Sequence, residues 1–251
     1  MSGSAAGRSE DMGRRGDERG RALLDALLEG RPEPGLAARA ATALRLPESG
    51  RYAVAVFPAG GGAAPGTRPD VQGLRVLWRR RGEREIAVVS LGDGDMAGLA
   101  TRLGRWCPGP GGIGPVADGL AGLGTARRLA EVALATCPPG TTGIVRLEER
   151  LPAALVVSQP ELSDRLLTGV FGPLLALDPA DRALLVGTLE AWLECGGSAG
   201  RAAGRLYCHR NTVLNRLRRL ERLTSRSLSR PRELTEMTLA LDAFTLTVPQ
   251  P

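Results

Sequence analysis

The chain has 251 residues, 43% of them hydrophobic, which is enough for one large or two modest domains with their own cores. Its 33 basic residues, all arginine, outnumber 27 acidic ones and give a net charge of +6. No apolar run approaches the roughly 18 residues of a membrane span, and the N-terminus lacks a hydrophobic signal segment, so we expect a cytoplasmic protein that does not enter a membrane. Four scattered cysteines and a single histidine argue against a zinc site.

The N-terminal part of the chain changes from a polar tail to helices. Residues 1–20 mix glycine, serine, arginine and aspartate without an apolar period, so we expect a disordered tail. From Arg21 onward, four leucines form one helical stripe that Gly30 can end. A second helix is expected over residues 35–46, after a proline-rich break.

Extended segments follow these helices. Three stretches rich in β-branched and aromatic residues predict strands at Arg51–Ala59, Leu74–Arg80 and Glu85–Leu91. The last two are close enough to form a hairpin, and a flexible surface loop is expected between the first two, at Gly60–Asp70. A helix, a second helix and a strand are expected next, at Met96–Trp106, Thr125–Cys137 and Gly143–Leu147. Strands mixed with covering helices indicate one α+β domain over residues 21–160.

The glycine-rich stretches of this domain lack the arrangement of a phosphate-binding loop. None of "AGGGAAPG", "GPGGIGP" and "GLAGLG" matches Gly-x-Gly-x-x-Gly between a strand and a helix, and none ends in Gly-Lys-Ser/Thr. The stretch "GDGD" at Gly92–Asp95 starts like a calcium loop but lacks its terminal glutamate, so a turn with a helix N-cap is expected. We therefore expect no catalytic residue, no cofactor and no metal.

The second half of the chain is predicted to be entirely helical. Residues 161–177 are expected as a helical connector broken at Pro173. Asp178 as N-cap and Pro179 at the first helical position then open a helix that begins a second domain, residues 178–251. One buried stripe is expected on this helix, formed by Leu184, Leu185, Leu189, Trp192 and Leu193.

Positive charge is concentrated in one segment of this second domain. Between Arg201 and Arg232 there are ten arginines and one acid, Glu221, a local balance of +9 in a chain whose total is +6. The remainder of the protein is therefore mildly acidic. A basic segment on an acidic body is the electrostatic pattern of a nucleic-acid contact, although many charge runs are only solvated faces.

The pattern within the segment favours a helix-turn-helix. A short helix carries small inward residues, which let a second helix cross closely, and a tight turn follows. The second helix then has an apolar seam on one side and arginines elsewhere. Cys208 is expected to pack in the turn. The seam consists of Val213, Leu214, Leu217, Leu220 and Leu223.

The front of such a recognition helix enters the major groove of DNA. Arg210 suits guanine and Asn211 suits adenine, while His209 falls at the N-cap position. Arginines farther along the helix are better placed for backbone phosphates or for acidic side chains of the protein. The complete predicted DNA-contact set is His209, Arg210, Asn211, Thr212, Asn215, Arg201, Arg205, Arg218, Arg219 and Arg222.

These motifs resemble a known family. The stretches "HRNT" (His209–Thr212) and "RLRRLERLT" (Arg216–Thr224), with "LEAWLECGGS" before them and "ELTEMTLAL" after them, are similar to the C-terminal helix-turn-helix of PucR/CdaR-type bacterial transcriptional regulators. Ser225 stands where that family usually has glycine, and Asn215 where an aromatic residue is common. Upstream, "GIGPVADGLAGLGTARRLAEVALA" is similar to the GGDEF-like middle domain of the family.

The resemblance implies a function for each domain. Residues 21–160 would be a GGDEF-like regulatory or dimerisation domain without cyclase activity, because the hairpin turn reads "RRGERE" instead of the catalytic motif. The C-terminal domain would bind double-stranded operator DNA as a homodimer within the nucleoid, with an unidentified small molecule as a possible effector. The alternative hypothesis is a protein-interaction module whose basic helix binds an acidic partner. An enzyme is not expected.

Overall fold

The computed structural model describes residues 18–60, 73–107, 109–138 and 140–247. The chain divides into two compact units, Met1–Leu151 and Pro152–Pro251, whereas the sequence placed the first domain boundary at residue 160. Residues 18–29 are helical, so residues 18–20 do not belong to the expected disordered tail, and residues 1–17 of that tail lie outside the described part. Most of the expected loop at Gly60–Asp70 lies outside it as well.

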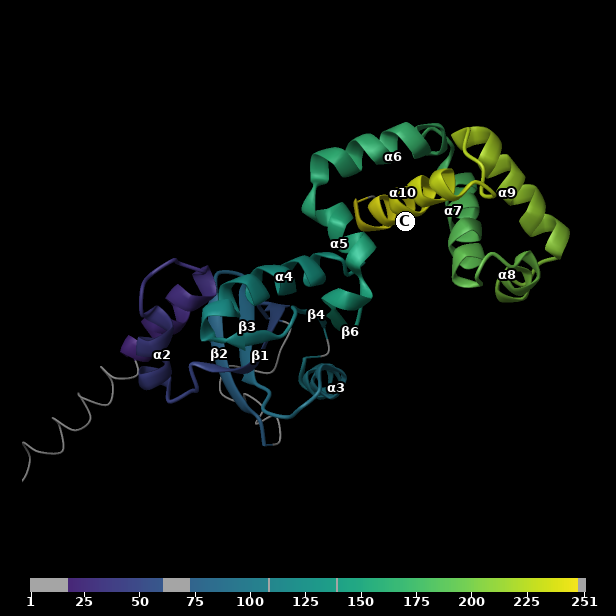
Figure 1. Cartoon of the computed structure of the whole chain (residues 1–251). Coiled ribbons are helices and arrows are strands. Elements are labelled where there is room, and N and C mark those ends of the chain that lie inside the picture. Colours follow the sequence, from purple (N-terminus) through teal and green to yellow (C-terminus); the bar gives the residue numbers. More distant parts are fainter. Residues whose placement is uncertain (1–17, 61–72, 108, 139, 248–251) are drawn as a thin grey trace, which may run out of the picture. The chain divides into compact units, whose positions relative to one another are not determined.

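The first unit is built on one mixed sheet of six strands in the order β2-β3-β1-β4-β6, with β5 paired to β1 (Figure 1). Strands β2 and β3 form the expected hairpin, in which Arg81 pairs with Arg84 and Gly82 takes a positive φ of 53°. Strands β4 and β6 are parallel, and the other pairs are antiparallel. The strands are β1 (Ser49–Pro58), β2 (Arg75–Arg81), β3 (Arg84–Ser90), β4 (Pro110–Ile113), β5 (Ala117–Gly119) and β6 (Gly143–Arg146).

Both faces of this sheet are covered by apolar side chains. Strand β1 alternates, because Val54 and Val56 join one core cluster whereas Ala55 and Phe57 join another. The first cluster packs under helix 18–29, α2 (Leu36–Leu44), the turn η1 (Leu120–Gly122) and α4 (Leu123–Ala135), and the second packs under α3 (Met96–Trp106). The turn η2 (Leu147–Glu149) follows β6. The expected α+β class is confirmed.

The glycine-rich stretch before α4 forms strand β4, where the sequence predicted no strand between the helices Met96–Trp106 and Thr125–Cys137. A side chain at Gly112 would place its Cβ 2.2 Å from the carbonyl oxygen of Ala130, and one at Gly114 would lie 2.1 Å from that of Ala126. Both glycines therefore let α4 lie directly on the sheet, which is a packing role. Because these glycines have no side chains, the stretch shows no alternation of apolar and polar residues from which a strand could be predicted.

The second unit consists of helices around one main core. Phe171 and Phe244 meet edge to face with ring centroids 6.4 Å apart, and Leu185, Leu189 and Leu220 are fully buried beside them. Within the described residues, no helix of either unit has the length and apolar character needed to cross a bilayer. The helices are α5 (Leu151–Ser158), α6 (Pro160–Leu175), α7 (Pro179–Glu194), α8 (Ala199–Arg205), α9 (Arg210–Thr224) and α10 (Pro231–Thr247).

Two expectations for this region were wrong. The segment expected as a connector belongs to α6, which supplies Phe171 and Leu174 to the core and continues through Pro173 to Leu175. Pro173 donates no hydrogen bond to the carbonyl of Gly169, but both residues are exposed, so water can reach that carbonyl and the helix continues for two residues. Leu184 is 41% exposed and does not join the buried stripe of α7.

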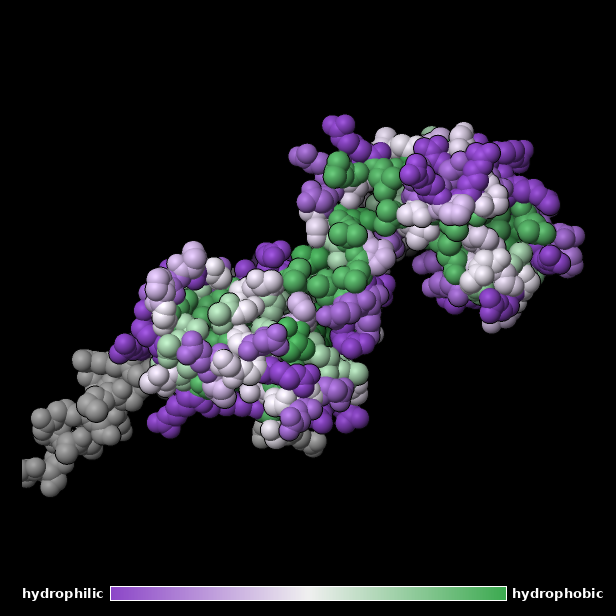
Figure 2. Space-filling model, viewed as in Figure 1, coloured by the Kyte–Doolittle hydropathy of each residue, from purple (hydrophilic) through white to green (hydrophobic). Residues whose placement is uncertain are grey.

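Some large apolar side chains of α5 and α6 are exposed and lie outside the core clusters of the protein. Leu155 on α5 is 71% exposed and Leu162 on α6 is 64% exposed, and hydrophobic residues are visible over these two helices in the space-filling view (Figure 2). Neither leucine belongs to a core cluster. The α5–α6 surface is therefore more apolar than the arginine-rich surface of α9.

Candidate nucleic-acid interface

Helices α8 and α9 form a helix-turn-helix around a small core to which Ala191 of α7 also contributes. Ser198 caps α8, its Oγ accepting a hydrogen bond of 3.3 Å from the Arg201 backbone N–H. Ala202 and Ala203 on α8 are buried against Val213 and Leu217 on α9. The small side chains on α8 allow the close crossing that the sequence predicted. This crossing fixes the direction in which the exposed side of α9 faces.

The turn between the two helices is held by a pair of backbone hydrogen bonds. The Cys208 N–H donates to the Ala203 carbonyl at 3.0 Å, and the Tyr207 N–H donates to the Gly204 carbonyl at 3.4 Å. Together these bonds form a Schellman motif that ends α8, with Tyr207 in the left-handed conformation at a φ of 50°. Cys208 packs against the cluster under α8 and α9, which confirms its expected packing role.

The first turn of α9 carries the predicted base-reading residues. His209 is the N-cap, and its Nδ1 accepts a hydrogen bond of 3.2 Å from the Asn211 backbone N–H. Arg210 and Asn211 are exposed, and neither side chain has a partner within the part of the chain that the structure describes. Thr212 is half-buried behind them. The front of the helix therefore presents an unpaired guanidinium and an unpaired amide to solvent.

The same exposed side continues toward the C-terminal end of α9. Asn215 and Arg218 are exposed and hydrogen-bonded to each other, with Arg218 Nη1 3.1 Å from Asn215 Oδ1. Arg222, one turn farther on, is exposed and has no partner among the described residues. Arg218 and Arg222 thus keep uncompensated positive charges, as backbone contacts to a nucleic acid require.

Three other arginines of the predicted DNA-contact set are engaged within the protein. Arg219 forms an ion pair of 2.6 Å with Asp181 on α7, and Arg205 forms one of 2.7 Å with Glu194 on the same helix. Arg201 donates to the carbonyl of Cys195 just before α8. Sequence reasoning could not pair these residues, because their partners lie in the preceding helix and its end.

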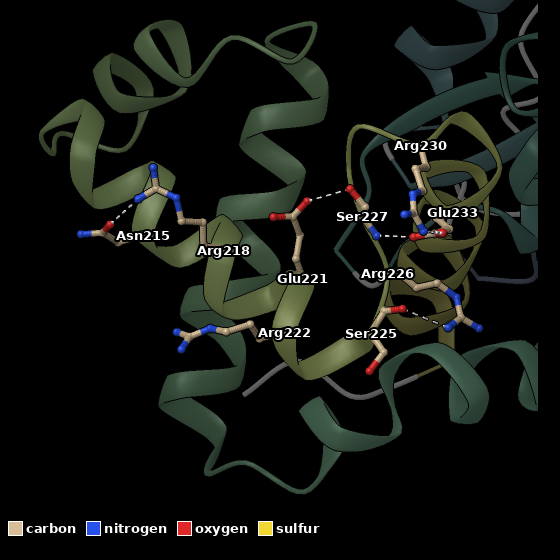
Figure 3. A pocket seen from close by; sticks show the side chains of 9 residues that line it. All are labelled: Asn215, Arg218, Glu221, Arg222, Ser225, Arg226, Ser227, Arg230 and Glu233. Atoms are coloured by element: carbon tan, nitrogen blue, oxygen red, sulfur yellow. Dashed lines mark hydrogen bonds and ion pairs between the residues drawn. The ribbon is translucent and has the colours of Figure 1, made fainter.

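A cleft of about 780 Å³ opens beside the C-terminal half of α9 (Figure 3). Its second wall is the loop that leads into α10, where Arg226 pairs with Glu236 at 2.6 Å and Arg230 with Glu233 at 2.9 Å. Glu221 reaches across to this loop and accepts from the Leu228 N–H at 2.8 Å. The cleft is lined by Asn215, Arg218, Glu221, Arg222, Ser225, Arg226, Ser227, Arg230 and Glu233.

The acidic groups of this cleft are all used in holding the loop. Arg230, by its hydrogen bond, and then the Ser227 N–H keep the pKa of Glu233 below its usual value. Glu221 is the single acid of the basic segment, and its carboxylate also accepts from Ser227 Oγ at 3.3 Å. Arg218 and Arg222 are left without a carboxylate, so the cleft continues the positive side of α9. Sequence reasoning missed Arg226, Arg230 and the loop serines as lining residues.

No metal-binding arrangement occurs in the described ranges, where no group of three or more histidine, cysteine or acidic side chains comes together. Asp95 instead caps α3, its carboxylate accepting from the Gly98 N–H at 2.6 Å. This confirms the turn and N-cap expected for "GDGD". The two cysteines of the first unit, Cys107 and Cys137, have a pKa raised chiefly by burial, which favours the neutral thiol over the thiolate.

Two family models match the chain. The PucR C-terminal helix-turn-helix domain matches residues 185–243, and the GGDEF-like domain matches residues 29–136. An uncharacterized protein of Mycobacterium tuberculosis is 31% identical over 158 residues, which are 61% of this chain and 36% of that protein. An uncharacterized protein from the pkwA 5′ region of Thermomonospora curvata is 41% identical over 75 residues, 30% of this chain and 41% of that protein.

The chain therefore spans well under half the length of these curated relatives. Among solved structures, a regulator of polyketide synthase expression from Bifidobacterium adolescentis aligns over 92% of this chain and 93% of its own, at 21% identity and a TM-score of 0.44. The two matched domains occur here in the order expected from the sequence motifs. The chain thus contains a GGDEF-like domain followed by a PucR C-terminal helix-turn-helix domain, which are the two domains that its resemblance to PucR/CdaR-type regulators predicts.

Proposed function

We propose that this protein is a transcriptional regulator that recognises specific double-stranded DNA sequences by placing His209–Leu223 in the major groove. The observation that carries the proposal is the front of α9, where Arg210 and Asn211 are exposed and have no partner within the described residues. An unpaired guanidinium and amide at this point of a helix-turn-helix have the donors and acceptors that base edges require.

The two residues would read different bases. Arg210 would donate two hydrogen bonds to O6 and N7 of guanine, and Asn211 would pair with N6 and N7 of adenine. His209 supports this reading indirectly, because its ring accepts from the Asn211 N–H and so fixes the start of α9, where Arg210 and Asn211 lie. Each base contact is worth about 1–3 kcal/mol of discrimination against the wrong base.

The phosphate backbone would be bound by the remaining charged side of α9. Arg218 and Arg222 are the best candidates among the predicted arginines, because their charges are not compensated by an acid. The cleft beside them gives room for a sugar-phosphate strand that leaves the groove. Thr212 and Asn215 lie between the two groups of contacts. Arg201, Arg205 and Arg219 would contribute less, since binding phosphate would compete with their present partners.

The assembly and regulation of the protein are also part of the proposal. Helix-turn-helix proteins commonly bind as dimers, with half-sites about one helical turn of DNA apart, so we expect a homodimer on an inverted repeat. The first unit would serve regulation or dimerisation without catalysis and without a cofactor, and any effector would act by binding one state of the dimer more tightly. The protein would then act in the cytoplasm, at the nucleoid.

The test is selection of bound DNA from a pool of random duplexes by the whole chain. The wild type should enrich one sequence, whereas the Arg210→Ala, Asn211→Ala double variant should bind the pool and enrich none. Arg128→Ala removes an exposed arginine from the first unit and serves as the charge control, with unchanged enrichment expected. Enrichment of the same sequence by the double variant would contradict the assigned reading residues.

The same selection experiment distinguishes the proposed function from the alternative, a basic helix that binds an acidic protein partner. If α9 binds an acidic protein partner, the wild type should show only weak binding to DNA that is the same for every sequence. No enrichment by the wild type, over several rounds at moderate salt, would thus overturn the proposed regulator function.

A further inference from the structure

The two tyrosines of the chain have opposite environments. Tyr52 in the first unit is buried, and its hydroxyl donates to the Pro47 carbonyl at 2.6 Å. Tyr207, in the turn before α9, is 97% exposed, and its hydroxyl has no partner within the described parts of the chain. An exposed aromatic residue is not unusual by itself. The backbone beneath Tyr207 is what makes its side chain informative.

Tyr207 occupies the position of a Schellman motif at which glycine is usual. Its φ of 50° is left-handed, a conformation disfavoured for residues with a Cβ and uncommon for a bulky side chain. The bonds from Tyr207 and Cys208 to the end of α8 hold it there. The fold therefore accepts backbone strain at a position where the ring makes no core contact. Strain of this kind clusters at functional sites.

The location of Tyr207 indicates what its ring contacts. It stands two residues before the His209 cap and three before Arg210, at the end of α9 assigned to the major groove. The segment around it has a charge of +9, so a polyanion is the ligand that this surface attracts. Phosphate oxygens accept hydrogen bonds from tyrosine hydroxyls in many protein–DNA interfaces.

We propose that Tyr207 binds the DNA backbone at the edge of the major groove, its hydroxyl donating a hydrogen bond to a phosphate and its ring lying on the adjoining deoxyribose. The contact fixes how the front of α9 enters the groove and does not itself read a base. This inference rests on the proposed DNA-binding function and adds a positioning contact that lies outside the predicted DNA-contact set.

Two substitutions distinguish the contribution of the Tyr207 hydroxyl to DNA affinity from the contributions of the ring and of the strained backbone. Tyr207→Phe removes only the hydroxyl, so the melting temperature should stay unchanged while affinity falls about three- to tenfold. Tyr207→Gly removes the ring and relieves the backbone, so affinity should fall about tenfold or more while the melting temperature rises by about 4 °C. A variant that is more stable but binds less well cannot be explained by misfolding.

Arg45→Gly provides the matched control for strain. Arg45 ends α2 in the first unit with a φ of 52°, so its replacement should also raise the melting temperature but leave DNA affinity unchanged. Affinity should be measured by fluorescence anisotropy on two labelled duplexes, the sequence selected by the wild type and a random sequence. Because a phosphate contact is independent of sequence, both duplexes should lose affinity by the same factor.

The outcomes distinguish this inference from the proposed function. Wild-type affinity of Tyr207→Phe for both duplexes would overturn the hydroxyl contact, even if the Arg210 and Asn211 variants behave as expected; a protein partner would then be the remaining ligand for this ring. A loss confined to the selected duplex would also overturn it, because it would indicate base reading. Failure of the wild type to bind either duplex would remove both proposals together.

Discussion

Arg218 and Arg219 are neighbours on α9, but replacing each by alanine should change a different property of the protein. Arg218 is exposed beside Asn215, to which it donates a hydrogen bond, and has no acidic partner within the described residues. Arg219 points toward α7 and pairs with Asp181 at 2.6 Å. Arg218→Ala should therefore weaken DNA binding, and Arg219→Ala should act on stability.

The magnitudes follow from these two environments. Loss of one phosphate contact should reduce the slope of log affinity against log salt concentration by about 0.9. The side chains of the Arg219–Asp181 pair are 40% and 42% exposed, so solvent screens the pair. Exposed ion pairs contribute about 0–1 kcal/mol, and Arg219→Ala should cost no more than that while leaving the slope unchanged.

The assay is fluorescence anisotropy on a random-sequence duplex at several salt concentrations from about 50 to 200 mM, with urea unfolding of the same variants. Arg128→Ala in the first unit controls for the change in net charge, since it alters neither the slope nor the stability of the second unit. A slope reduced equally by Arg218→Ala and Arg219→Ala would refute the argument. It would mean that the ion pair with Asp181 opens when DNA binds.

Three further predictions concern the second unit. Ser225→Gly should stabilise the protein by about 1 kcal/mol in urea unfolding, because Ser225 ends α9 with a φ of 52°; an unchanged or lower stability would contradict the strain there. Asp178→Ala should cost about 1 kcal/mol, because the Asp178 carboxylate accepts from two backbone N–H groups at the start of α7, and Asp178→Asn should recover most of it. The folded-state pKa of Glu233 is below its unfolded value of 4.5, so its stabilising effect is present above that pH and is lost as pH falls through the folded pKa. Glu233→Gln should therefore be less stable than wild type at pH 7 and equally stable in strong acid, and a gap that persists in acid would assign the loss to something other than charge.

Local features of the fold were predictable from the sequence. The caps Asp95, Asp178 and His209 each precede a helix whose start depends on hydrogen bonds within three residues, and all three were confirmed. The hairpin was also predicted, and the ends of β1, β2 and β3 were predicted to within two residues. The β-branched and aromatic residues that indicate a strand lie within each segment itself.

Features that depend on contacts between distant segments were not predictable. The glycines of β4 show no alternation of apolar and polar residues. Gly112 must be glycine because a Cβ there would collide with the backbone of α4, which is distant in the sequence. The pairing of Arg219 with Asp181 depends on how α9 crosses α7, which no spacing within α9 reveals. The left-handed conformation of Tyr207 follows from the Schellman motif, whereas the sequence shows only a tyrosine where glycine would serve.

Genome-wide occupancy of the tagged protein in its own cells tests the central claim most directly, when run beside the Arg210→Ala, Asn211→Ala variant expressed at the same level. The account predicts discrete sites that share an inverted repeat for the wild type and the loss of those sites for the variant. The same sites occupied by both proteins, or no discrete sites for the wild type, would contradict the assignment of α9 as a sequence-reading helix.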